Sequence, residues 1–496
     1  MKHTQDKDVK SFFQNYLHLI FGNILISNIT GFLVLFLIVR ILEPDSYGVF
    51  VLFGSVAAIA AIMANWTSAS IVRFGREEFM AEGTVKKTFW ANYTIILPAF
   101  VVLFLLLFLL RGTLTEYIGI SEGYYYLIFT LIMATNLIGN IPTFFQAMGR
   151  MKYFAYLPQV SGIIWLVVLA VVYFAAIPIS VEILIALLIL TYFCVSILGF
   201  WLLKKDIWPP SISREWLRKC FKFSYPLAFS NVGSAIIGHV DQIVIGIFMP
   251  VAFVGIYHIA YRIQNYIFGL PNLSRNLMLP LMTSLVVDGQ ADKIRQYVKT
   301  YVPQIAFFWS LLLSLFMVFS REIMLIFGQD YIEAFLPFSI LLAASSLRIF
   351  YVIESPILTS HGLTKEIAGM AIATAIINLG LDYLLIPIMG ISGAAIATSI
   401  SLVAIVIMRT FLVKKRTGIN DFLNYPWVFP ALLSIGALFI SSLPLRGLLL
   451  LIVVLISFLI AKKSSIFNLK SLAILDIIDM PVFVRRTAKA VYSLLI

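Results

Sequence analysis

Charged residues and cysteines are scarce in this chain. Only 12% of its 496 residues are charged and 61% are hydrophobic, whereas a soluble globular domain is roughly 25% charged and about 45–50% apolar. The two cysteines, Cys194 and Cys220, lie within or at the start of apolar runs and match neither a disulfide framework nor a zinc site. A P-loop and a Ser/His/Asp arrangement are also missing. We therefore expect that the chain is not an enzyme and needs no cofactor.

Long apolar runs occupy almost the whole sequence instead. A helix needs about 20 predominantly apolar residues to cross the hydrocarbon core of a membrane. The runs predict an all-α polytopic membrane protein of about fourteen transmembrane helices, with a kink at Pro271 and Pro280 in the eighth. The expected helices are 17–42, 47–72, 88–111, 123–147, 153–175, 180–203, 220–248, 252–282, 298–319, 332–357, 365–387, 391–413, 424–442 and 445–461.

Positive charge is distributed unevenly between the loops. The net charge is +12, but Lys and Arg cluster in alternate short loops between apolar runs, so no nucleic-acid partner is expected. The opposite set of loops contains only Arg40, Arg111, Arg321 and Arg446. Because cytoplasmic loops are enriched in Lys and Arg, both termini are expected in the cytoplasm, which requires an even number of helices. The predicted location is the inner or plasma membrane.

The sequence also repeats itself. Segment 42–50, after the first expected helix, is similar to 248–257, and segment 145–152 is similar to 358–365. This predicts two six-helix halves of the same orientation, related by an axis along the membrane normal, and such halves suggest alternating access. The expected divisions are an N-terminal lobe (1–205), a basic cytoplasmic linker (206–219), a C-terminal lobe (220–416), two further helices (417–461) and an amphipathic basic cytoplasmic tail (462–496).

The second half carries most of the polar residues expected inside the membrane. An ionisable side chain is costly in lipid, so each one is a functional candidate. Spacings of three and four residues place several of them on one helix face. The substrate-binding candidates are Arg262, Arg275, Arg348, Asn231 and Asn265, and the candidates for coupling or ion pairing are Asp241, Asp382 and His258.

Two interpretations of these residues are open. In the first, Arg262, Arg275 and Arg348 form a cationic cavity, since guanidinium groups bind phosphate through paired donors. In the second, the charges have a structural role: Asp241 neutralises Arg262, and Glu354 neutralises Arg348. Neither interpretation includes a bound metal.

Four motifs carry a resemblance to a known family. They are LEPDSYGVF at 42–50, KFSYPL at 222–227, DQIVIG at 241–246 and VGIYHIAYRI at 254–263. In this order and at these helices, they resemble the polysaccharide-transporter branch (O-antigen and oligosaccharide flippases) of the multidrug/oligosaccharidyl-lipid/polysaccharide exporter superfamily. The resemblance covers nearly all of residues 10–461.

The resemblance implies two six-helix lobes that form a V around a central cavity. It also implies a flippase, which moves a polyprenyl-pyrophosphate-linked oligosaccharide from the cytoplasmic to the outer leaflet for surface polysaccharide biosynthesis. The partners implied are this lipid-linked substrate, membrane lipids and, functionally, glycosyltransferases and a polysaccharide polymerase. In relatives that carry lipid II, the first helix contributes cations to the cavity. Here it has Asn23 and Asn28, which argues against lipid II as cargo.

Two other functions are open. An ion-coupled multidrug or metabolite exporter of the same superfamily would need a deep carboxylate for the ion. The first helix lacks the acidic residue of that branch, and Asp241 is the best candidate elsewhere. A membrane-embedded glycosyltransferase or polymerase would need a large extracytoplasmic loop, but the longest outer loops expected, near 111–123 and 320–332, are too short.

Overall fold

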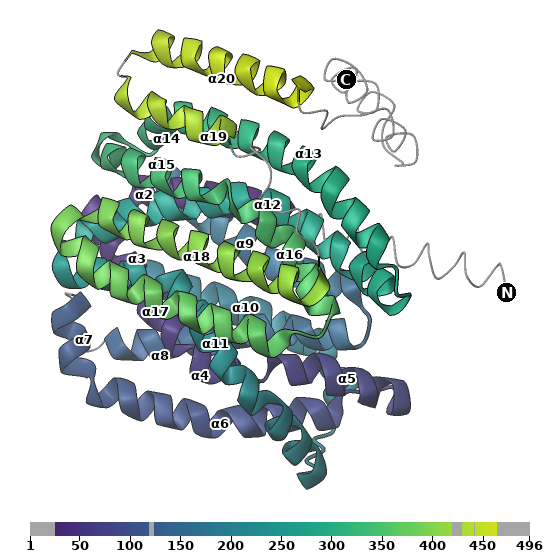
Figure 1. Cartoon of the computed structure of the whole chain (residues 1–496). Helices are drawn as coiled ribbons and strands as arrows, with labels where there is room; N and C mark the ends of the chain where they lie inside the picture. Colours follow the sequence, from purple (N-terminus) through teal and green to yellow (C-terminus); the bar gives the residue numbers. More distant parts are fainter. Residues whose placement is uncertain (1–24, 119–123, 419–428, 441, 464–496) are drawn as a thin grey trace. The chain divides into compact units, whose positions relative to one another are not determined.

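The computed structural model of the chain describes residues 25–118, 124–418, 429–440 and 442–463 (Figure 1). Over these ranges every regular element is a helix and no strand occurs, which confirms the expected all-α fold. A helix satisfies its backbone hydrogen bonds internally, so lipid can surround it. Within these ranges, the structure does not describe the side chains of residues 63, 226–237, 270, 272–274, 276–277, 280–281, 300–301 and 463.

Eight of the described helices are long and apolar enough to span a membrane, and the bent pair α15–α16 would make a ninth. The chain is therefore a multi-pass membrane protein, while the total of about fourteen helices remains a prediction. The eight are α6 (Lys86–Leu109), α8 (Tyr124–Ala147), α9 (Met151–Phe174), α10 (Val181–Ile207), α13 (Ala291–Val318), α17 (Thr364–Met389), α18 (Ile391–Thr417) and α20 (Leu443–Lys463).

The chain divides into two compact units, and each is described by itself. Unit 1 contains Met1–Ile259 and Leu379–Ile391, and unit 2 contains Ala260–Asn378 and Ser392–Ile496. Helix α11 (Arg214–Phe248) packs against α3, α5 and α6 of unit 1, although the repeat would place it at the start of the C-terminal lobe. The two-lobe repeat, with its linker and its two extra helices, remains a prediction. The tail beyond residue 463 lies outside the described residues.

The other elements of unit 1 are shorter or extend beyond the expected spans. The expected helix 47–72 is broken, and near one break Ser68 and Ser70 donate their hydroxyls to the carbonyls of Asn65 and Thr67. The elements are α2 (Ser27–Ile41), α3 (Pro44–Ala60), α4 (Ile62–Asn65), α5 (Ser68–Glu82), α7 (Arg111–Ile118) and the start of α12 (Val251–Val287).

In unit 2 the expected helix 332–357 is also broken. It consists of α15 (Phe335–Ser345) and α16 (Arg348–Ser360), which are bent by 42° relative to each other. The bend falls at the serine pair Ser345–Ser346, and serine pairs are recurrent kink sites. In contrast, α12 continues through Pro271 and Pro280 without interruption. The remaining elements are α14 (Ser320–Leu325), η2 (Gln329–Ala334), α19 (Phe429–Ser434) and η3 (Ile435–Phe439).

Unit 1 is held together by an aromatic core and a buried cap. Phe89 of α6 lies 5.1 Å from Phe144 of α8, measured between ring centres, within the range of favourable aromatic pairs. The carboxylate of Glu78, which is 1% exposed, accepts the backbone N–H groups of Lys87 at 2.7 Å and Thr88 at 2.8 Å. These donors lie in the first turn of α6 and have no partner within their own helix. Glu78 therefore fixes the start of α6 against the end of α5.

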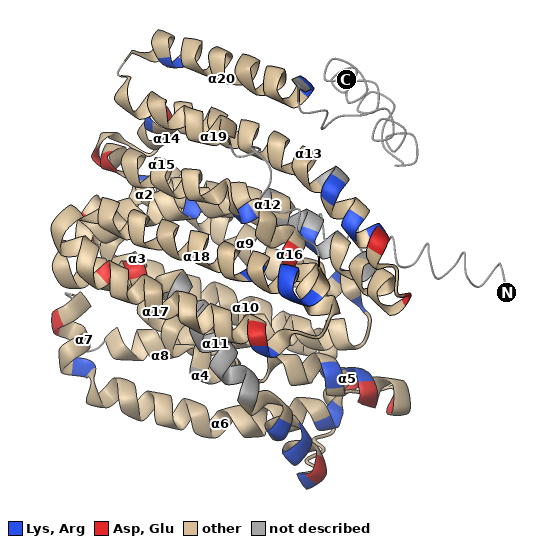
Figure 2. Cartoon of the chain, in the orientation of Figure 1, with Lys and Arg blue, Asp and Glu red and all other residues tan. Residues whose placement is uncertain are grey.

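Lys and Arg residues gather at the same end of neighbouring helices within each unit (Figure 2). In unit 2, α13 begins beside Lys293 and α18 ends in Lys414, Lys415 and Arg416. In unit 1, α10 ends in Lys204 and Lys205. These are the loops that the sequence assigns to the cytoplasmic side.

Candidate functional site

A polar cluster in unit 2 is built from α12, α16 and α18. Helix α16 presents Arg348, Tyr351 and Glu354 at intervals of three residues, which brings them close to one another along the helix surface. The other two helices supply further cations, Arg275 from α12 and Arg409 from α18. In an otherwise apolar part of the chain, each of these charges requires a functional or structural explanation.

Arg348 and Asn265, two of the predicted substrate-binding residues, lie together. The Arg348 guanidinium is 3.6 Å from the centre of the Phe268 ring, and its Nη1 donates to the Asn265 Oδ1 at 3.4 Å. The Asn265 Nδ2 donates in turn to the carbonyl of Tyr261 at 2.9 Å. The aromatic face stabilises the cation, and the amide holds the guanidinium in position.

Tyr351 joins the other two arginines. The Arg275 Nη1 donates to the Tyr351 hydroxyl at 3.2 Å, and the Arg409 guanidinium lies 4.3 Å from the centre of the Tyr351 ring. Arg409 is only 3% exposed, and its Nε and Nη1 have no hydrogen-bond partner among the described residues. A buried guanidinium with two open donors can bind the oxygens of an anion.

Arg409 and Tyr351 were not among the site residues predicted from the sequence. Arg409 lies only five residues before the basic group Lys414–Arg416 at the end of α18, so it resembles part of the cytoplasmic charge. Its position inside the expected transmembrane helix 391–413 was the feature that could have identified Arg409 as a site residue. Tyr351 had no signal, because tyrosines are common at membrane interfaces without a ligand.

Glu354 contacts α18 and does not match the alternative in which it neutralises Arg348. It is fully buried, and Thr410 donates its hydroxyl to the Glu354 Oε1. The neighbouring Arg409 is the cation that acts electrostatically on this carboxyl. The cluster thus contains three arginines and one glutamate, and cationic charge is in excess.

Two predicted site residues are not part of this cluster in the described structure. Arg262 is exposed on α12, with its guanidinium 5.8 Å from the centre of the Tyr266 ring one turn away. Asn231 is in α11, but its side chain lies outside the described residues. Both remain predictions.

The predicted coupling residues belong to a second site, in unit 1. Asp382 in α17 is fully buried, Asp241 of α11 is 2% exposed, and the two carboxyl groups lie close enough to interact electrostatically. The Tyr257 hydroxyl donates to the Asp241 Oδ2. Two carboxyl groups in such proximity cannot both be ionised without a proton or a cation between them. The pair can therefore hold one.

His258 lies next to Tyr257 and contacts a different helix. Its Nδ1 is 2.6 Å from the hydroxyl of Tyr47 on α3. The same contact region is tightly packed, because a Cβ at Gly48 would lie 2.0 Å from the carbonyl oxygen of Val251. In the structure, His258 therefore connects the two motif segments 42–50 and 254–263.

Solved structures with the same architecture define the class of fold. An inward-facing multidrug-resistance MATE transporter of the MOP superfamily aligns with a TM-score of 0.63 and 16% identity, over 83% of this chain and 99% of its own. The lipid II flippase MurJ, in an inward closed conformation, aligns with a TM-score of 0.62 and 17% identity, over 87% of this chain and 97% of its own. The fold is that of MOP-superfamily transporters.

Sequence comparison then gives the family. The family model described as "Polysaccharide biosynthesis protein" matches residues 12–286, more than half of the chain, and the protein belongs to this family. Two relatives from Haloferax volcanii are the probable low-salt glycan biosynthesis flippase Agl15, 26% identical over 190 residues, and the probable flippase AglR, 23% identical over 205 residues. These matches cover 37% and 41% of this chain and only 39% and 41% of the relatives.

Proposed function

We propose that this protein is a flippase that moves a polyprenyl-pyrophosphate-linked oligosaccharide from the cytoplasmic to the outer leaflet by alternating access. The observation that carries the proposal is the pair of arginines, Arg275 and Arg409, that share one interaction partner, Tyr351. Family membership and the flippase relatives support the class of function.

The physical reason is the cost of concentrating cations in an apolar surrounding. Three arginines and one glutamate leave positive charge that the described neighbours of the cluster do not balance. A diphosphate supplies the opposite charge and several acceptor oxygens, and guanidinium groups match it through paired donors. A polyprenyl tail can stay in lipid while the charged group passes the arginines.

The cationic character of the cluster disfavours the exporter alternative for cationic drugs. An organic cation would be repelled by Arg275, Arg348 and Arg409. The fold neighbours include a multidrug transporter, but at 16% identity this shows the fold alone. The exporter thus remains the second function to be tested.

We further propose the orientation and the driving force. The basic loop ends support a cytoplasmic location for both termini, in the inner or plasma membrane. The buried pair Asp241 and Asp382 is the proposed site of a coupling proton or monovalent cation, with Tyr257 holding Asp241 in place. Glycosyltransferases that build the cargo and a polymerase that consumes it would be functional partners.

The test is gene deletion in the native host followed by complementation. We expect the deletion strain to lose surface polysaccharide and to accumulate lipid-linked repeat units that face the cytoplasm. Wild type should restore export, and so should Arg111→Gln, which changes a half-buried residue far from the cluster in sequence. Arg275→Gln/Arg409→Gln should not restore it at equal expression. Losing charge-assisted hydrogen bonds of about 1.5–3 kcal/mol each would lower export about tenfold or more. Unchanged glycan together with increased sensitivity to cationic drugs would favour the exporter.

A further inference from the structure

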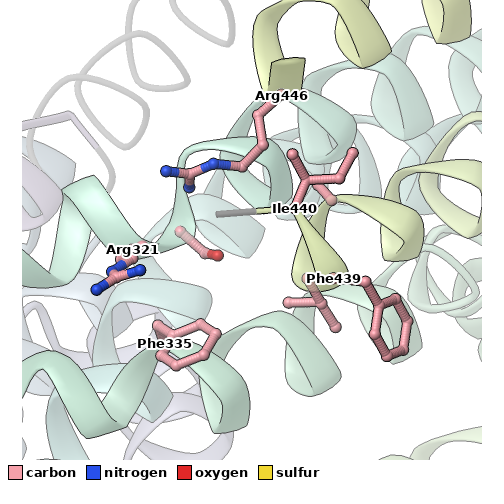
Figure 3. Close-up of a pocket in the computed structure, with 8 residues that line it drawn as sticks. Arg321, Phe335, Phe439, Ile440 and Arg446 are labelled. Carbon is pink, nitrogen blue, oxygen red and sulfur yellow. The ribbon is translucent and has the colours of Figure 1, made fainter. Parts of the chain in front are cut away.

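Unit 2 contains a second basic site, which shares no residue with the cluster on α12, α16 and α18. A cavity of about 140 Å³ is lined by the start of α14, the start of α15, the η3 segment and the start of α20. Its lining includes two arginines, Arg321 and Arg446, and two aromatic rings, Phe335 and Phe439. Figure 3 shows the Arg446 side chain extending from α20 toward the side of the cavity on which Arg321 lies.

Arg446 is buried and held in a fixed orientation. It is 5% exposed, and it donates to both carboxylate oxygens of Glu322, at 2.9 and 2.5 Å, and to the carbonyl of Val318 at 3.3 Å. Its Nε is buried without a hydrogen-bond partner among the described residues. Glu322 neutralises Arg446, so the exposed Arg321 leaves the cavity with a net positive charge.

The charge distribution of the chain makes this pair unusual. Only four Lys or Arg residues fall in the loops predicted to face away from the cytoplasm, and two of them line this one cavity. Membrane proteins keep such loops poor in positive charge. Two arginines on this side therefore point to an anion at the level of the lipid headgroups.

An apolar groove adjoins the basic cavity. It has a volume of about 430 Å³ and is lined by residues of α15, α18, α19 and η3, among them Ile340, Ala343, Val403, Leu432 and Leu438. Leu438 lines both the groove and the basic cavity. A basic cavity beside an apolar groove has the charge and polarity of a lipid-binding site, with one part for the headgroup and the other for a chain.

We propose that these adjoining cavities bind one anionic glycerophospholipid of the outer leaflet, with its phosphate at Arg321 and Arg446 and an acyl chain in the groove. The headgroup cavity is far smaller than the roughly 300–1,000 Å³ of ordinary ligand pockets, so it fits one phosphate and not the oligosaccharide of a glycan carrier. The bound lipid would join α20 to the end of α13 through Arg446. Only the assignment to the outer leaflet rests on the proposed orientation.

The test is lipid binding to the full-length protein, which does not depend on transport. Purified protein is placed in nanodiscs of phosphatidylcholine containing increasing phosphatidylglycerol, and retained lipid is identified by native mass spectrometry. We expect retention of one phosphatidylglycerol in preference to phosphatidylcholine. Arg321→Gln should weaken it about tenfold, as expected for one charge-assisted contact. Arg111→Gln, which removes another arginine predicted on the outer side, should leave binding unchanged.

A second variant tests the chain-binding groove without changing the charge. Ala343→Phe should fill the groove and reduce retention of phosphatidylglycerol, while the melting temperature without added lipid stays close to that of wild type. Equal retention of the two phospholipids would overturn the proposal, as would equal effects of Arg321→Gln and Arg111→Gln. Displacement of the lipid by millimolar inorganic phosphate alone, or retention of a polyprenyl phosphate in its place, would also overturn it.

Discussion

Arg409 lies with its guanidinium 4.3 Å from the centre of the Tyr351 ring, and the hydroxyl of the same tyrosine accepts a hydrogen bond from Arg275. One aromatic side chain thus holds two cations on different helices, α12 and α18. Without an anion, the two guanidinium groups repel each other. The arrangement therefore favours the state in which an anion is bound, which is the property that a carrier of a diphosphate-linked lipid needs.

Tyr351 should be the residue that sets the spacing of these arginines. Tyr351→Phe keeps the ring beside Arg409 but removes the hydrogen bond from Arg275, so we expect a mild loss of export. Tyr351→Leu removes both interactions, and cation–π contacts of about 0.5–2 kcal/mol predict a further loss of roughly two- to thirtyfold. The measurement is surface glycan in the complemented deletion strain. Equal export by the Leu and Phe variants would show that the ring has no such role.

Glu354 and Arg409 provide a way to separate stability from transport. Removing one of two neighbouring buried opposite charges leaves the other uncompensated, whereas replacing both with apolar residues is often nearly neutral. We expect Arg409→Met to lower the melting temperature of the purified protein and Arg409→Met/Glu354→Met to restore it.

Transport should respond differently to the same two variants. The double variant should remain inactive in complementation, because the anion-binding guanidinium is still missing. Recovery of export together with stability would mean that Arg409 has only a structural role. A melting temperature that stays low in the double variant would show that the two side chains do not compensate each other.

The carboxyl pair Asp241 and Asp382 should determine how transport responds to ion gradients. Asp382→Asn keeps the size of the side chain but removes one of the two acids, so the pair can no longer exchange a proton or cation in the same way. We expect glycan export to lose its dependence on the sodium or proton gradient, while the protein remains folded. The measurement is export in cells treated with ionophores selective for each ion. An unaltered gradient dependence in Asp382→Asn would exclude this pair as the coupling site.

Gly48 should be intolerant of any side chain. A Cβ there would meet the carbonyl oxygen of Val251 at 2.0 Å, whereas a Cβ at Gly54 on the same helix α3 would meet nothing within 4 Å. Overpacking costs roughly 1–3 kcal/mol and sometimes more. We therefore expect Gly48→Ala to lower the melting temperature clearly and Gly54→Ala to leave it almost unchanged. Similar melting temperatures for the two variants would contradict the close approach of α3 and the start of α12.

Much of the fold could be predicted from the sequence, because apolar runs of membrane-spanning length determine where helices form. The bounds of α8 and α9 differ from the expected spans by at most two residues. The breaks near Ser68 and Ser345, where hydroxyl groups bond locally to the backbone, were not predicted. A hydropathy pattern contains no information about such bonds.

The candidate site could be predicted only in part. The sequence identified Arg275, Arg348 and Asn265, and the structure brings Arg348 and Asn265 into contact. It did not identify Arg409, because residue spacing relates side chains along one helix and not side chains on two different helices. Arg275 of α12 and Arg409 of α18 are distant in sequence, and only the folded chain places both on Tyr351.

The contact between the two motif segments could not be predicted from the sequence either. The sequence marks 42–50 and 254–263 as features of the family, but it does not indicate that they touch. In the structure the Tyr47 hydroxyl lies 2.6 Å from the Nδ1 of His258, and a Cβ at Gly255 would lie 2.8 Å from the Tyr47 ring. This close packing explains the glycines at positions 48 and 255, and a single sequence cannot reveal it.

The most direct test of the flippase proposal is transport by the purified protein in liposomes. Lipid-linked oligosaccharide extracted from the deletion strain is incorporated into the vesicles, and its movement across the bilayer is followed by its accessibility to an added glycosidase. We predict that wild type and Arg111→Gln accelerate this movement, and that Arg275→Gln/Arg409→Gln does so at least about tenfold less. If wild-type protein fails to move the lipid-linked oligosaccharide but moves an organic cation under the same ion gradient, the proposal is contradicted.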